Sequence, residues 1–175
     1  MEKIRRLASM ELPNWDEIPS YGLYKGELLD YLKEVLSPLY VVDKNVITPS
    51  MINNYVKLEY IEKPDNKKYM RSTIAQLIVI TIFKQVISIE DIVKGIEIEI
   101  ENFAFKESYQ DFVGIFTCAK KDFLNTNNNL NIKVNFKEHR DKVWYYLASS
   151  LFTKLYTKII IDESEEKWWK KLQYW

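Results

Sequence analysis

Apolar residues recur at helical spacing along much of the chain, beginning with Lys25–Leu36. Within this stretch leucine or valine stands at almost every third or fourth position. Such spacing places the apolar side chains on one face, so it predicts an amphipathic helix. The helix is expected to end at Ser37-Pro38, because proline pushes the residue before it out of the helical conformation. A linker is then expected over residues 39–47.

A second, shorter helix is predicted over Pro49–Leu58. Thr48 can cap its first N–H groups, and Pro49 suits the first helical position, where no N–H partner is needed. The helix is followed by the turn-forming residues Lys63-Pro64-Asp65-Asn66. A third helix is expected to open at Ser72 or Thr73.

Two conformations compete for the segment "IEIEIENF", residues 96–103. Strict alternation of isoleucine and glutamate favours a strand. The isoleucines at 89, 92, 96 and 100, together with Phe103, also fit one face of a helix that Ser88 would cap. We predict the helix, because it continues an established pattern without an intervening turn signal.

The C-terminal part carries two more helical patterns, over Tyr109–Leu124 and Glu138–Ile161, separated by a polar loop at residues 125–131. The pattern as a whole predicts a mainly all-α fold without internal repeats. We expect three parts: a lead-in segment at 1–20, a DNA-binding domain at 21–100, and a helical dimerisation or effector region at 101–175.

The amino-acid composition argues against several classes of function. The chain has 175 residues, with 25 Lys plus Arg balanced by 25 Asp plus Glu, so global charge gives no argument for nucleic acid. One cysteine and one histidine cannot form a zinc site or a disulfide, and Cys118 is expected in the core. Four glycines cannot build a glycine-rich nucleotide loop. We expect neither an enzyme nor a cofactor.

No secretory signal is expected. The charged start is not followed by an apolar segment of the kind that a secretory signal requires. The longest apolar run, near Leu77–Phe83, is too short to span a bilayer. A cytoplasmic protein without membrane contact is therefore expected.

The predicted helix at Pro49–Leu58 has two different sides. Its apolar side is formed by Met51, Ile52, Tyr55 and Val56, and its polar side carries Ser50, Asn53, Asn54 and Lys57. Asparagine can pair with the edge of adenine in the major groove, and serine and lysine can reach base edges or phosphates. Helix 25–36, the linker and this helix would make a helix-turn-helix, although with a longer linker than usual.

The segment that follows this helix is basic. Residues 44–71 hold six basic residues and three acidic ones, a local net charge of +3. A basic loop beside a polar helix is typical of phosphate contact in DNA-binding proteins. The basic residues expected to contact phosphates are Lys63, Lys67, Lys68 and Arg71.

The segments "TPSMINNYVKLEYI", "NKKYMRSTIAQLIVI" and "FKQVISIEDI" resemble the winged helix-turn-helix of the MerR class of bacterial regulators. The chain is also similar to the family known as domain of unknown function 1836, found in Gram-positive bacteria. Trp15, "MINNYVK" (51–57), "KKYMR" (67–71), residues 74–80 and Lys84 carry this resemblance, which covers roughly residues 15–100.

The resemblance implies a transcriptional regulator with a MerR-like domain, in which Tyr55 would lie partly in the core and partly against the DNA backbone. Two positions depart from the MerR pattern: Asn53 replaces an arginine, and Glu59-Tyr60 replaces Gly-Leu. The turn after the helix is therefore expected to differ. The cysteines of metal-sensing members have no counterpart, so metal sensing is not implied.

The partners expected are double-stranded DNA and a second copy of the chain, since a dimer could read a palindrome. The C-terminal aromatic residues could form the dimer interface, an effector pocket, or simply the core of one chain. An alternative function is a helix-turn-helix module that binds protein and not DNA.

Overall fold

The computed structural model describes residues 2–125 and 139–172, and this part of the chain is mostly helical, which confirms the all-α prediction. None of its helices is long and apolar enough to cross a bilayer. Short 3₁₀ helices, η1 and η2, lie at Trp15–Glu17 and Ser37–Val41. The other elements are α1 (Glu2–Ala8), β1 (Leu23–Tyr24), α2 (Lys25–Val35), α3 (Pro49–Lys57), β2 (Lys68–Tyr69), α4 (Arg71–Phe83), α5 (Ile89–Asn102), α6 (Phe105–Asn125) and α7 (His139–Leu172).

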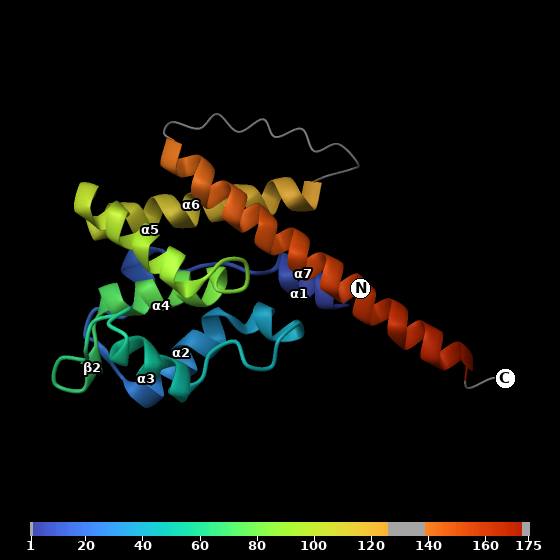
Figure 1. The fold of residues 1–175 in the computed structure, drawn as a ribbon, viewed down its shortest axis with the longest axis horizontal. Helices are drawn as coiled ribbons and strands as arrows, with labels where there is room; N and C mark the ends of the chain where they lie inside the picture. The colour runs from blue at the N-terminus through green and yellow to red at the C-terminus, as the bar shows by residue number, and fades with distance from the viewer. Residues whose placement is uncertain (1, 126–138, 173–175) are drawn as a thin grey trace.

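Helix α4 lies at the centre of the fold, between α2 and α3 below and α5, α6 and α7 above (Figure 1). Ten of its thirteen residues are buried. The helix is enclosed on all sides because both halves of the molecule pack on it. It begins at Arg71, slightly before the predicted start.

The ambiguous segment at 96–103 is helical through Asn102, as predicted, and belongs to α5. Ser88 caps this helix: its Oγ accepts a hydrogen bond of 3.1 Å from the Asp91 N–H. The predicted linker at 39–47 is partly taken up by η2. Helix α7 extends beyond the predicted end at Ile161, as far as Leu172. Of the predicted polar loop, residues 126–131 lie outside the described part of the chain.

The buried residues form one contiguous core from Leu7 to Ile159, and residue 100, the predicted domain boundary, falls inside α5. The centre of this core is aromatic. The ring of Phe83 on α4 lies 5.6 Å from that of Phe112 on α6 and 5.7 Å from that of Trp144 on α7. These contacts join the N-terminal helices to the α6–α7 pair.

Cys118 corrects a prediction from the sequence, because it is exposed and not buried. It lies on the outer side of α6, since the inner side is taken by Phe112, Phe116 and Ala119. Two residues further on, Lys120 is buried instead. Its ammonium group donates a hydrogen bond of 2.6 Å to the Met10 carbonyl and so ties the lead-in segment to α6.

Candidate nucleic-acid interface

Helix α3 begins as its sequence predicts. Thr48 stands before the helix and its Oγ1 accepts a 3.2 Å hydrogen bond from the Met51 N–H, while Pro49 occupies the first turn. Ile52 and Tyr55 hold the helix against the core, with exposed fractions of 0% and 4%. The apolar side of the helix is thus an anchor, and its opposite side remains free.

The polar side of α3 faces solvent. All four polar residues predicted on this side, Ser50, Asn53, Asn54 and Lys57, are exposed. Because the burial of Ile52 and Tyr55 prevents the helix from turning about its axis, these four side chains keep a common direction. The four side chains therefore form one exposed surface, as the sequence predicted.

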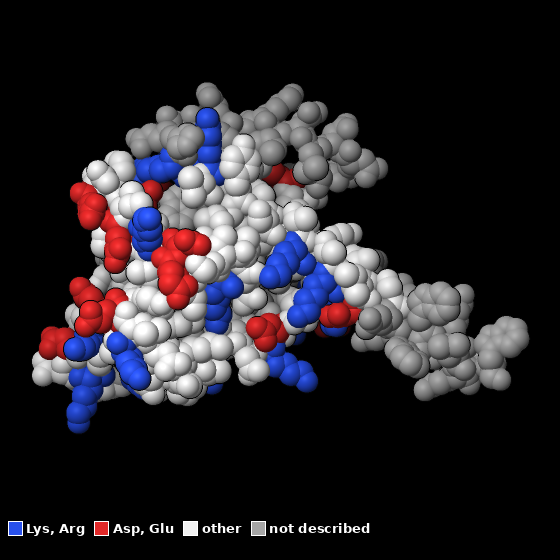
Figure 2. Space-filling model, in the orientation of Figure 1, with Lys and Arg blue, Asp and Glu red and all other residues white. Residues whose placement is uncertain are grey.

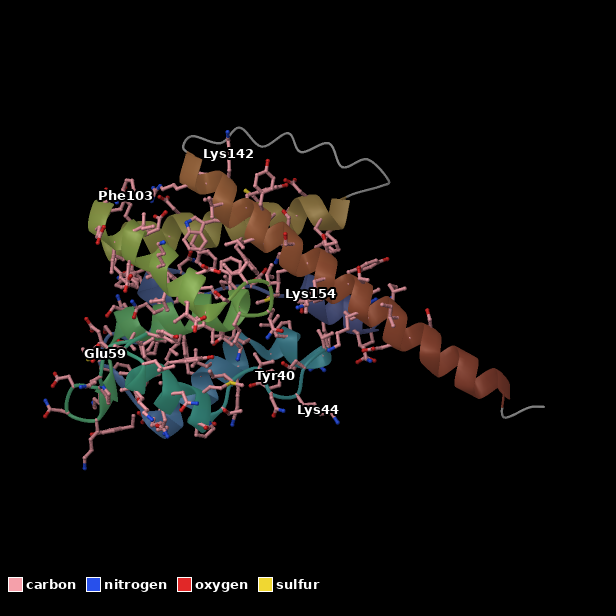
Figure 3. The ribbon with its side chains drawn as sticks, viewed as in Figure 1. Tyr40, Lys44, Glu59, Phe103, Lys142 and Lys154 are labelled. Atoms are coloured by element: carbon pink, nitrogen blue, oxygen red, sulfur yellow. The ribbon has the colours of Figure 1, made fainter. Side chains whose placement is uncertain are left out.

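The end of α3 is shaped by Glu59, which has a φ of 59°. This left-handed conformation normally favours glycine, the residue that the MerR pattern has here. The Tyr60 N–H donates to the Tyr55 carbonyl at 2.9 Å and closes the helix end. The turn therefore forms without glycine, at some conformational cost. Figure 3 shows Glu59 at the junction between α3 and the following segment.

The basic segment after α3 folds into a tight turn over residues 65–68. Asn66 and Lys67 have φ values of 47° and 67°, and the Lys68 N–H donates to the Asp65 carbonyl at 2.8 Å. Two consecutive positive φ values are the mark of a type I′ turn. Lys67 lies at the tip of this turn and is exposed, as is Lys63 just before it.

Strand β2, which leaves the turn, pairs with a second segment besides the one that precedes the turn. It pairs antiparallel with β1, which directly precedes α2, so that Leu23 lies opposite Tyr69 and Tyr24 opposite Lys68. Gly22 makes this approach possible: it has a φ of 69°, and a Cβ on it would lie 3.0 Å from Met70 Sδ. The basic turn is thereby held beside the start of α2.

The dipeptide Tyr24-Lys25 joins the two predicted surfaces. Lys25 Nζ donates a hydrogen bond to Asn53 Oδ1 on α3, at 2.5 Å. Lys68 Nζ lies 5.1 Å from the centre of the Tyr24 ring, a cation–π contact. The amide side of α3 and the lysine turn are therefore parts of one surface, with Tyr24-Lys25 between them.

Sequence reasoning did not find Tyr24 or Lys25 as parts of this surface. Lys25 is separated from Asn53 by 28 residues, and no local spacing connects residues so far apart. The only signal in the sequence was that Lys25 and Asn53 both lie at polar positions of the two helices that were expected to form one helix-turn-helix. The contact depends on how α2 and α3 are oriented.

Two of the predicted contact residues lie apart from this surface. Tyr55 is buried because it anchors α3, and this burial raises the pKa of its hydroxyl. Arg71 is turned toward the lead-in segment: its Nη1 lies 3.5 Å from Asp16 Oδ1, and its guanidinium lies over the Trp15 ring at 5.5 Å. Both side chains therefore contact other parts of the protein and lie away from this surface.

Lys84, which belongs to the resembling motif, also has an internal role. It follows α4, and its Nζ donates to the Val46 carbonyl and lies 3.2 Å from Met51 Sδ. Burial lowers the pKa of its ammonium group. Lys84 thus holds the segment before α3 against the end of α4, and it fixes the position of α3 from behind.

The charge around the basic turn is mixed. Exposed Glu59, Glu62 and Asp65 lie in the same segment as Lys63 and Lys67. Figure 2 shows blue and red side chains next to each other at the lower left, where the turn lies in Figure 1. The surface therefore offers lysines at particular places on a background that is close to neutral.

A small cavity lies away from this surface, among α4, α5, α6 and α7. Its volume is about 30 Å³, and Gln76, Phe112 and Trp144 are among its lining residues. The lining also includes Ser108, whose buried Oγ has no hydrogen-bond partner. A space of this size suits about one water molecule, which the Ser108 hydroxyl could bind.

The sequence profile of the family described as a domain of unknown function, DUF1836, matches residues 13–113. The match covers more than half of the 175 residues and includes every residue of the surface described above. The chain belongs to the DUF1836 family. No curated protein and no solved structure matches it.

Proposed function

We propose that this DUF1836 protein is a cytoplasmic transcriptional regulator that binds double-stranded DNA in a sequence-specific manner. The observation that carries the proposal is the single surface on which α3 and the basic turn meet through Tyr24-Lys25. A helix that presents amides and a hydroxyl, flanked by lysines, matches what the major groove offers: base edges to read and phosphates on both sides.

In this proposal the residues of the surface divide into two roles. Ser50, Asn53 and Asn54 reach the base edges, because their short polar side chains stand on the exposed side of α3. The lysines at 57, 63, 67 and 68 contact phosphates, which position the protein but carry no sequence information.

We further propose that residues 21–100 form a MerR-like winged helix-turn-helix, as the sequence resemblance implies. The order of elements supports this: a short strand, helices α2 and α3, a basic turn whose strand pairs back to the first strand, and then α4 and α5. Two features depart from it. The segment between α2 and α3 contains the additional helix η2, and the turn contributes one strand only.

The regulator would act as a homodimer, because one helix contacts few base pairs and two copies related by symmetry would read a palindrome. Helix α7 supplies a suitable face. Val143, Tyr146 and Ile161 are 50%, 52% and 52% exposed and lie on the side opposite the buried Trp144 and Phe152. Exposed apolar side chains at helical spacing favour contact with a partner.

The alternative, a module that binds protein, has one observation in its favour. Tyr21 and Leu58 are 68% and 56% exposed, and both border the proposed DNA surface. Apolar contacts are much less sensitive to salt than phosphate contacts, for which log K falls by about 0.9 per contact for each tenfold rise in salt. Salt dependence therefore separates the two functions.

The test is fluorescence anisotropy with labelled DNA from the protein's own upstream region, at two salt concentrations. We expect tight binding that weakens steeply with salt. Asn54→Ala should weaken specific binding by about 1–3 kcal/mol, and leave binding to random DNA nearly unchanged. Gln110→Ala, an exposed amide on α6, is the matched control. A binding affinity that changes neither with salt nor in Asn54→Ala would contradict the proposal.

A further inference from the structure

The contact between Lys25 and Asn53 determines which end of the asparagine amide faces outward. Lys25 is the first residue of α2 and Asn53 is exposed in the middle of α3. The lysine Nζ donates to Oδ1 at 2.5 Å. An ammonium group has only donors, so it can bind the amide oxygen but not the amide nitrogen. The oxygen of Asn53 is therefore held toward Lys25.

The planar amide then directs its nitrogen away from Lys25. Nδ2 carries two N–H donors and stands about 120° from the oxygen, so the end of Asn53 that is not engaged by Lys25 has donors only. Two further N–H groups of the Lys25 ammonium remain at the same place. The pair thus presents more donors than acceptors, because one of the two lone pairs of Oδ1 is engaged and a positive charge lies beside the other.

Nearby carboxylates do not neutralise this arrangement. Glu27, two residues after Lys25, accepts a 2.9 Å hydrogen bond from the Tyr24 N–H and caps α2. Within residues 2–124 and 140–164, where side chains are described, no ion pair involves Lys25. The positive charge of Lys25 therefore remains available to strengthen the hydrogen bonds of the pair.

A positively charged pair that is rich in donors discriminates between the two purines. Adenine presents one acceptor, N7, and one donor, N6–H₂, in the major groove, and an unrestrained asparagine binds both with its oxygen and its nitrogen. Guanine presents two acceptors, N7 and O6. Oδ1 keeps a second lone pair, but the positive ammonium bound to it disfavours a further N–H donor, such as adenine N6–H₂, at the same oxygen. Guanine instead offers two acceptors, to which Nδ2 of Asn53 and Nζ of Lys25 can both donate.

We propose that Lys25 is a positioning residue that makes Asn53 select guanine. The inference rests on the proposed DNA binding and adds to it the base that one residue reads. Removing the ammonium group would release the amide oxygen and restore selection of adenine.

The first measurement needs no DNA. In ¹H–¹⁵N spectra of the free protein, Lys25→Met should shift the side-chain amide signals of Asn53 and leave those of Asn54 nearly unchanged. Lys33→Met, an exposed lysine at the other end of α2, is the control and should shift neither pair. Unchanged Asn53 signals in Lys25→Met would overturn the contact itself, whatever DNA does.

The second measurement is selection of bound sequences from a random DNA library, with the wild type and the same variants. We expect guanine at one position of the site in the wild type and in Lys25→Arg, which keeps the donors. Lys25→Met should change that position to adenine, with a preference of about tenfold. Asn53→Ala should remove the preference at that position alone.

The outcomes distinguish the two proposals. Adenine at this position in the wild type, or the same base in Lys25→Met as in the wild type, overturns the role of Lys25 while DNA binding stands. Failure of the wild type to enrich any sequence overturns both proposals, even where the spectra show the contact. Guanine in the wild type with a change to adenine in Lys25→Met supports both.

Discussion

The role of each lysine in this protein depends on what its ammonium group reaches. Lys84 and Lys120 donate to backbone carbonyls in the interior, and Lys25 donates to an asparagine at the surface. Lys63 and Lys67 extend into solvent. A count of charges treats all five alike. Only the exposed lysines and Lys25 are available to a partner, so the zero net charge of the chain says little about its surface.

Buried tyrosines give the protein a defined response to high pH. Burial raises the pKa of the Tyr31 hydroxyl to about 12, and the negative charges of Glu17 and Glu34 add to this shift. An unfolded tyrosine ionises near pH 10. Between about pH 10 and 12 the unfolded chain thus releases a proton that the folded chain keeps, and stability falls as pH rises.

Tyr31→Phe should therefore make the unfolding free energy less dependent on pH above 10, as measured by urea unfolding at pH 8 and 11. At pH 8 the variant should be about as stable as the wild type, since the buried Tyr31 hydroxyl makes no hydrogen bond. Equal loss of stability in wild type and Tyr31→Phe would contradict the assignment.

At the scale of elements, the turn at 65–68 has a structural task and, in our proposal, a functional one. Asn66 occupies the first positive-φ position, to which asparagine is suited, but Lys67 occupies the second, where glycine is preferred. The lysine costs conformational free energy there. Its retention at the tip is understandable if its charge is used, which is the role proposed for it.

Two substitutions of Lys67 separate these tasks. Lys67→Gly should stabilise the protein by about 0.5–1 kcal/mol because it relieves the positive φ. Lys67→Ala removes the same charge without that relief and should stabilise nothing. Both should weaken DNA binding and reduce the salt slope by about 0.9. Thermal unfolding and anisotropy measure the two effects, and a stabilisation shared by both variants would refute the turn assignment.

At the scale of the whole molecule, α7 has one side in the core and one side exposed to solvent. Its inner side carries Trp144, Tyr145 and Phe152 into the core, whereas Tyr146 and Tyr156 are exposed. Its C-terminal part extends beyond the other helices (Figure 1). Lys154 on the same helix donates to the Gln85 carbonyl in the loop after α4. One helix thus contributes buried side chains to the core and carries the exposed apolar face that we propose for a second copy.

If that face forms the dimer, Ile161→Glu should shift the protein toward monomer in sedimentation velocity experiments and leave its helical circular dichroism unchanged. Binding to a palindrome should weaken about tenfold or more, and binding to one half-site should not. Leu124→Glu, at an exposed apolar position on α6, is the control. A monomeric wild type, or a dimer insensitive to Ile161→Glu, would exclude this face.

Much of the architecture followed from the sequence because it depends on neighbouring residues. Helical spacing predicted α2, α3, α5 and the long C-terminal helix, and local capping residues predicted their starts at Thr48 and Ser88. The exposed polar side of α3 followed in the same way, because the buried side of a helix is set by its own periodicity. These features need no knowledge of the rest of the fold.

Tertiary packing decided the remaining features. It enclosed α4 on all sides, turned Cys118 outward, engaged Tyr55 and Arg71 within the protein, and brought Lys25 to Asn53. Each of these depends on contacts between residues far apart in the chain, which spacing cannot express. The sequence by itself determined which side chains α3 offers, whereas only the packing of α2 against α3 decided which atoms of Asn53 are free to bind.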